Sequence, residues 1–111
     1  MAENVGGAAG SRFGPGFVYV MRDGKQVKIG CSREPGKRLE KIQRDRPHTK
    51  LEAQIEADEM NGAETAAQKA LKKHFQMQKI ADNATDWFYI PEGVSIDDIV
   101  KTVEKAVNRN Q

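Results

Sequence analysis

A strand–turn–strand pattern near the amino terminus constrains the fold of this 111-residue chain more than any other feature. Residues 17–21 are aromatic, β-branched or otherwise apolar, which is typical of a β-strand. Asp23 and Gly24 follow, and this dipeptide favours a tight hairpin turn because glycine tolerates the positive φ that such turns require. The pattern therefore predicts a second strand over residues 26–30, paired with the first.

The next two segments follow the periods of a helix and of a half-buried strand. A helix is predicted over residues 35–45, because Pro35 suits the first helical position and Leu39 and Ile42 provide an apolar side. Apolar and polar residues then alternate, which predicts a strand with one face in water. Its buried face is expected to carry Leu51, Ala53, Ile55 and Ala57.

The second half of the chain contains two more helix patterns and one short strand pattern. A helix is predicted from Asn61, as its N-cap, to about residue 78, and an aromatic strand is predicted over residues 87–90. A last helix, residues 95–109, begins at Ser95 and has an apolar stripe at helical spacing. The stripe consists of Ile96, Ile99, Val100, Val103 and Val107.

The order of these segments, β-β-α-β-α-β-α, predicts a single α/β domain with a small, mainly antiparallel sheet flanked by helices. Residues 1–15 are rich in glycine and alanine and are expected to form a flexible tail. The domain itself is expected to span residues 16–111. One cysteine and no long apolar segment favour a protein of a reducing, intracellular compartment without a membrane span.

Positive charge is concentrated in one part of the sequence. Residues 21–50 contain ten Lys or Arg and four Asp or Glu, a local net charge of +6, whereas residues 51–60 contain four acidic residues and no basic one. A basic field of this kind attracts polyanions, of which nucleic acid is the commonest. A solvated helix face of mixed charge is the alternative interpretation.

Two side chains on the predicted helices have both a structural and a functional interpretation. Glu64 lies on the apolar stripe of its helix, where a carboxylate is costly unless it is paired or binds a cation. It also follows Asn61 by three residues, as the returning residue of a capping box does. Arg38 could hold a phosphate through its guanidinium group or could cover apolar surface with its stem.

Together, these residues resemble the GIY-YIG nuclease superfamily, although each is common by itself. Phe17-Val18-Tyr19 stands for the first motif, Lys28-Ile29-Gly30 for the second, and Arg38 and then Glu64 follow on helices. The ending Asp86-Trp87-Phe88-Tyr89-Ile90 is similar to that of the short phage- and virus-type branch, in which the second motif commonly reads K-I-G.

The resemblance implies a role for each matching residue. Tyr19 would help to activate water, Arg38 would hold the scissile phosphate, and Glu64 would be the only protein ligand of one Mg²⁺ or Mn²⁺ ion. Lys28 replaces the second tyrosine of most members and could accept a proton in its place. The implied function is metal-dependent endonucleolytic hydrolysis of DNA, without a small-molecule cofactor.

The basic residues around these positions are expected to hold the DNA backbone, whether the DNA is duplex or branched. A nucleic-acid-binding module that retains the fold without turnover is the alternative, favoured by Lys28 and by the lack of a separate targeting domain. The expected backbone contacts are Lys25, Arg33, Lys37, Lys41 and Arg44.

Overall fold

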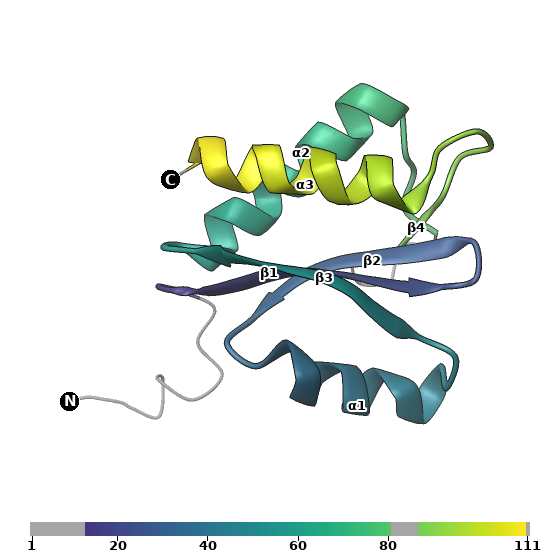
Figure 1. Cartoon of the computed structure of the whole chain (residues 1–111), viewed down its shortest axis with the longest axis horizontal. Helices are drawn as coiled ribbons and strands as arrows, with labels where there is room; N and C mark the ends of the chain where they lie inside the picture. The colour runs from purple at the N-terminus through teal and green to yellow at the C-terminus, as the bar shows by residue number, and fades with distance from the viewer. Residues whose placement is uncertain (1–12, 81–86, 111) are drawn as a thin grey trace.

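A computed structural model of the chain describes residues 13–80 and 87–110. Residues 1–12 of the predicted tail are therefore outside the described residues. The described part is a small α/β domain with four strands and three helices in the predicted order (Figure 1). The elements are β1 (Gly16–Asp23), β2 (Gln26–Ser32), α1 (Pro35–Asp45), β3 (Lys50–Ala57), α2 (Met60–Phe75), β4 (Trp87–Tyr89) and α3 (Ile96–Asn110).

The strands form one sheet in the order β3-β1-β2-β4, and all neighbours are antiparallel. The predicted hairpin between β1 and β2 is confirmed, with Gly24 at φ 61° in its turn. Tyr19 lies opposite Gly30, and Met21 lies opposite Lys28. Because paired residues of neighbouring strands share a face, these four side-chain positions are on the same side of the sheet.

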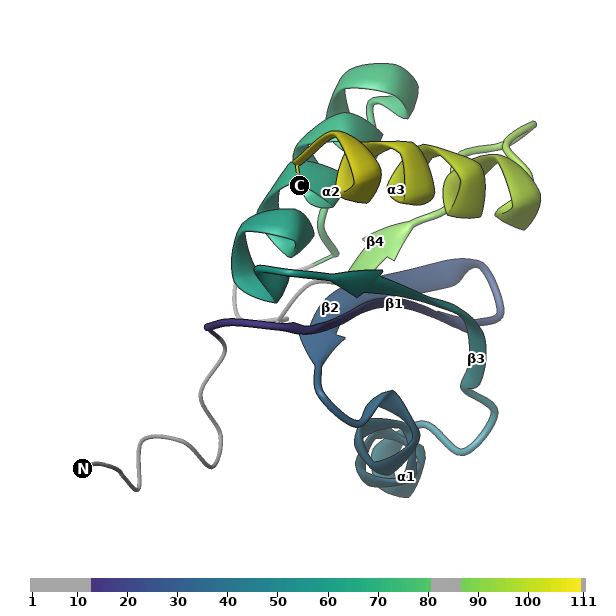
Figure 2. The same ribbon diagram turned by 60° about the vertical axis from the view of Figure 1, so that its left-hand side comes forward.

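The other side of the sheet faces the hydrophobic core. Helices α2 and α3 cover this side, whereas α1 lies on the side of Tyr19 and Lys28 (Figures 1 and 2). The predicted stripe of α3 is confirmed, because Ile99, Val103 and Val107 are fully buried against this core. Ser95 caps α3, as its hydroxyl accepts a hydrogen bond from the Asp98 amide at 3.0 Å.

Helix α1 has the predicted bounds but buries little surface. Leu39 and Ile42 are only half-buried, and Pro35 is the one fully buried residue of this helix. Its other side chains are mostly charged and exposed. The helix therefore lies on the sheet as a largely solvated, cationic element.

The face of β3 differs from the prediction at one residue. Val20 pairs with Ala53, but Met21 pairs with Leu51, so Glu52 is an extra residue in β3. This β-bulge changes the alternation and places Leu51 on the side of Met21, away from Ala53. The prediction that Leu51 shares a face with the other apolar residues of β3 is therefore wrong.

The beginning of α2 also differs from the prediction. Glu59, not Asn61, is the N-cap, and its carboxylate accepts hydrogen bonds from the amides of Gly62 at 2.7 Å and Gly14 at 2.8 Å. The Met60 amide in turn donates to the Gly14 carbonyl at 2.9 Å. Glu64 is thus not the third helical residue, and the capping-box interpretation of Glu64 is wrong.

The Glu59 cap gives the fold a predictable dependence on acid. Hydrogen bonds from Gly62, Gly14 and Asn61 lower the pKa of Glu59 below its ordinary value of 4.5. The pKa of Glu59 is lower in the folded protein than in the unfolded chain. The cap therefore stabilises the fold fully at pH values above the unfolded-state pKa, and this stabilisation is lost as the pH falls through the folded-state pKa. We expect Glu59→Gln to flatten the decline of the melting temperature between about pH 6 and pH 2. If the melting temperatures of the two proteins declined in parallel as the pH was lowered, this assignment would be contradicted.

Candidate functional site

The candidate site begins at the outer edge of β2. Strand β4 is short and pairs only with the first half of β2, where Trp87 lies opposite Lys28. Beyond this point, the Gln68 side chain from α2 approaches the β2 edge and donates from Nε2 to the Ile29 carbonyl at 3.0 Å. The same amide donates to Glu64 Oε2 at 3.0 Å. Gln68 therefore holds the Glu64 carboxylate beside the second half of β2.

Tyr19 reaches the same part of β2 from β1. Its side chain is 2% exposed and lies across Gly30, so that a Cβ atom added to Gly30 would overlap the phenol ring and its hydroxyl group. Only glycine leaves room for the ring there. The Tyr19 phenol therefore lies at Gly30, and Gln68 links the Glu64 carboxylate to the carbonyl of the preceding residue, Ile29.

Lys28 is buried on the same side of the sheet as Tyr19. It is 7% exposed, and its Nζ lies 6.0 Å from the centroid of the Trp87 ring. The Arg46 guanidinium carbon lies 3.9 Å from the centroid of that ring. The Trp87 ring of β4 therefore lies near both the Lys28 amine and the guanidinium group of Arg46, the residue that follows α1.

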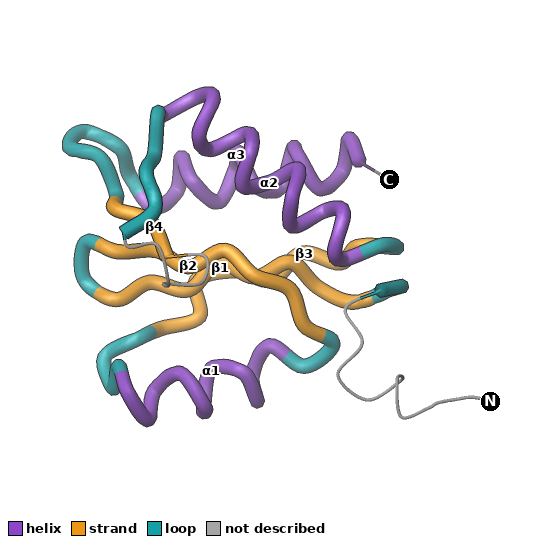
Figure 3. The backbone as a smooth tube through the Cα atoms, turned by 180° about the vertical axis from the view of Figure 1, so that it is seen from behind, coloured by secondary structure: helices purple, strands orange, loops and turns teal. Residues whose placement is uncertain are grey.

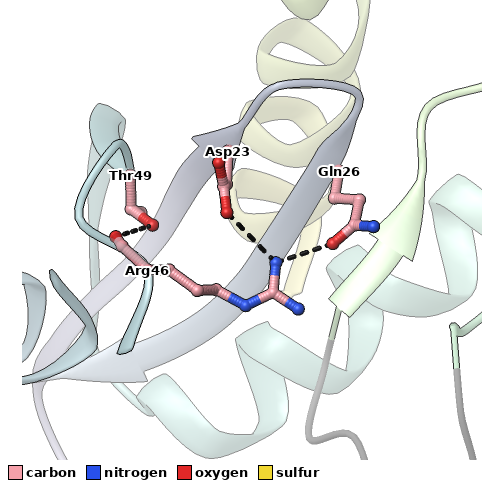
Figure 4. A network of polar contacts seen from close by, with 4 residues as sticks. All are labelled: Asp23, Gln26, Arg46 and Thr49. Carbon is pink, nitrogen blue, oxygen red and sulfur yellow. Dashed lines mark hydrogen bonds and ion pairs between the residues drawn. The ribbon is translucent and has the colours of Figure 1, made fainter. Parts of the chain in front are cut away.

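A polar network fixes Arg46 at this position. Its Nη1 donates to Gln26 Oε1 at 2.6 Å and to Asp23 Oδ2 at 3.3 Å, and its carbonyl accepts from the Thr49 hydroxyl at 2.8 Å (Figure 4). In the sequence, Arg46 stands out only as one of ten basic residues and Trp87 only as part of the aromatic ending 86–90, and Gln68 carries no signal. Their contacts with other elements join residues 20 to 59 apart in the chain, which a local pattern does not reveal.

Arg38 is the expected site residue that the structure does not join to the others. It is exposed on α1, on the side of the sheet that carries Tyr19 and Lys28. Among the described residues it has no ion pair or side-chain hydrogen bond. Its guanidinium group is therefore accessible to a phosphate from solvent.

The basic residues expected to contact DNA lie on or near α1. Lys25 is exposed at the hairpin turn, and Lys41 and Arg44 are exposed on the helix. Lys37 pairs with Glu34 at 3.2 Å on the surface, an interaction that contributes little stability. Arg33 donates to the Phe13 carbonyl, so part of its hydrogen-bonding capacity is used within the protein.

The described residues contain no cluster of three or more His, Cys, Asp or Glu side chains that could hold a metal ion. A divalent cation at Glu64 would therefore have at most two such side chains as ligands within the described ranges, and water and phosphate oxygens would complete its shell, as is common for Mg²⁺. None of the helices in the described ranges has the length and apolar character needed to span a bilayer.

Comparison with known proteins gives one match, which covers nearly all of the described residues. The family model of the T5orf172 domain matches residues 16–110. This domain is found in phage proteins and is related to GIY-YIG-like, nuclease-type folds, and it is compatible with a nuclease-like or DNA-binding module. No curated protein and no solved structure matches the chain significantly.

Proposed function

Because the chain belongs to the T5orf172 domain family, we propose that it is a metal-dependent endonuclease that hydrolyses DNA phosphodiester bonds. The observation that carries the proposal is the burial of three ionisable side chains around one sheet strand. Tyr19, Lys28 and Glu64 are 2%, 7% and 6% exposed. Buried ionisable side chains that lie close together are typical of acid–base sites, which supports the proposal.

In this proposal, Glu64 binds one Mg²⁺ or Mn²⁺ ion. Its carboxylate is a hard oxygen donor, and the hydrogen bond from Gln68 at 3.0 Å orients it. The bound cation supplies positive charge that stabilises the phosphate as it is attacked. Arg38, exposed on α1, supplies a second positive group and holds the scissile phosphate through its planar guanidinium.

Tyr19 and Lys28 act on the attacking water. The Tyr19 hydroxyl lies over Gly30. The preceding residue, Ile29, accepts the hydrogen bond from Gln68, which also binds Glu64. Lys28 is two residues from Gly30 on the same strand face, where a neutral amine can accept the proton that Tyr19 or the water loses. The Trp87 ring, with the Arg46 guanidinium on it, lies beside the Lys28 amine.

The role of Lys28 can be tested with two substitutions. We expect Lys28→Arg to lose most of the cleavage activity, because arginine remains charged and cannot accept a proton at the working pH. Lys28→Met should lose the same activity and also the rise of rate with pH. The measurement is the single-turnover cleavage rate across a pH series. A Lys28→Arg protein with a rate and pH profile near those of the wild type would assign Lys28 to phosphate contact instead.

The cationic surface of α1 predicts how DNA binding depends on salt. Each phosphate contact adds about −0.9 to the slope of log K against log salt concentration for duplex DNA. Replacing Lys37, Lys41 and Arg44 by glutamine should make this slope less steep by about 2–3. The slope is measured by fluorescence anisotropy with a labelled duplex in EDTA. An unchanged slope would place these side chains away from the nucleic acid.

A panel of DNA substrates distinguishes the endonuclease from the alternative function, a nucleic-acid-binding module without turnover. Supercoiled, branched and single-stranded DNA are incubated with the full chain at several Mg²⁺ and Mn²⁺ concentrations, and the products are resolved by gel electrophoresis. Cleavage of at least one DNA form in the presence of the metal supports the endonuclease. Retention of every form without strand breaks supports the module.

A further inference from the structure

A second cationic surface lies on the far side of the sheet from α1, where α2 and α3 pack together (Figures 1 and 3). Two adjoining hollows of about 350 Å³ each open along this helix pair, and both are lined by His74 and Arg109. We refer to them together as the α2–α3 groove. Small side chains line one of the hollows and leave it open; these are Ala66, Ala70 and Ala106.

The charged residues that line the α2–α3 groove are all basic. The lining residues include no Asp or Glu. At 100° per residue, Asp97 and Glu104 of α3 lie on the flank of that helix away from Thr102 and Ala106, which line the groove. Asp98 lies on the groove side at the start of the helix, one turn before Thr102, where its carboxylate accepts a hydrogen bond from the Ser95 amide at 3.4 Å. Exposed basic side chains form its borders: Lys69, Lys73, His74, Lys105 and Arg109.

The proposed cleavage chemistry does not use this groove. On α2, Glu64 and Gln68 lie on the flank next to β2, whereas Lys69 and Lys73 lie on the flank next to α3. The cations of α1 lie beyond the sheet. One helix therefore carries the proposed metal ligand on one flank and part of a separate cationic surface on the other.

We propose that the α2–α3 groove is a second nucleic-acid-binding surface, which takes a phosphate backbone without reading its sequence. Uniform positive charge complements a polyanion, and the alanines let a strand approach the helices closely. A phosphate chain fits this surface better than an acidic peptide, because the borders present a row of cations without an extended apolar anchor. Phosphates held here belong to a different segment of the nucleic acid from those held by α1.

The test compares two variants of equal charge in the full-length chain. The groove variant carries Lys69→Gln, Lys73→Gln and Lys105→Gln. The matched control carries Lys72→Gln, Lys79→Gln and Lys101→Gln, three exposed lysines that neither line the groove nor belong to the basic segment 21–50. Binding of a labelled duplex is measured against salt in EDTA, so that the result does not depend on whether the wild type cleaves DNA. Thermal melting of both variants checks that the fold is retained.

We expect the groove variant to make the log–log slope less steep by about 2–3, and the matched control to change it by less than about 1. Equal changes in the two variants would show a bulk charge effect and overturn the proposal. Labelled polyglutamate provides a second probe. If the groove variant lost polyglutamate binding but kept the wild-type DNA slope, the surface would belong to an acidic protein partner, and the proposal would be wrong.

Discussion

Replacing Glu64 by glutamine is expected to lower Mg²⁺-dependent DNA cleavage by ~100-fold or more, because the amide cannot replace the negative ligand of the cation. Glu59 provides the α2 cap, so the substitution leaves the helix start intact. The glutamine retains the size of Glu64 and can still bond to Gln68, so the stability of the protein should change by no more than about 1 kcal/mol. Cleavage and thermal melting are measured on the same preparation.

Glu56→Gln is the matched control for this substitution. Glu56 is an exposed carboxylate on β3, so its loss changes the net charge equally without touching the site. The control should cleave at the wild-type rate. If Glu64→Gln cleaved as fast as this control in Mg²⁺, Glu64 would have no part in the chemistry.

The second large effect is expected at Gly30. A methyl group at this position overlaps the Tyr19 ring and hydroxyl, and the ring is almost fully buried. Overpacking of this kind costs about 1–3 kcal/mol. It also displaces the phenol, and a shift of about 1 Å in an active site can lower the rate by ~100-fold. We therefore expect Gly30→Ala to lower both the melting temperature and the rate of cleavage.

Gly36→Ala is the control for adding a methyl group. Gly36 lies in α1, and nothing is within 4 Å of the added Cβ atom. Alanine is the better helix former by roughly 0.5–1 kcal/mol, so this variant should be at least as stable as the wild type. A Gly30→Ala protein with the melting temperature and activity of the Gly36→Ala protein would show that Tyr19 is not held by Gly30.

The order of the elements could be predicted because each depends on local signals. Asp23-Gly24 determines the hairpin, Pro35 the start of α1, and Ser95 the start of α3. The errors occurred where distant residues decide the structure. The bulge at Glu52 depends on pairing with β1, and the cap by Glu59, which also binds the nearby Gly62 amide, is completed by the Gly14 backbone 45 residues away.

The residues of the candidate site could be proposed from the sequence only in part. Tyr19, Lys28 and Glu64 were identified by their resemblance to a family, and the structure buries all three around β2. Gln68, Arg46 and Trp87 were not identified, because their positions depend on how α2, β4 and the end of α1 meet the sheet. No spacing in the sequence contains that information.

The proposal of a metal-dependent endonuclease is tested most directly by nicking of supercoiled plasmid. The wild-type chain and the Glu64→Gln variant are incubated side by side with Mg²⁺, with Mn²⁺ and with EDTA, and open circles are quantified over time. We expect nicked circles only with the wild type and only in the presence of a divalent cation. Intact plasmid after incubation of the wild type with metal, at protein concentrations where all the plasmid is bound, would contradict the proposal.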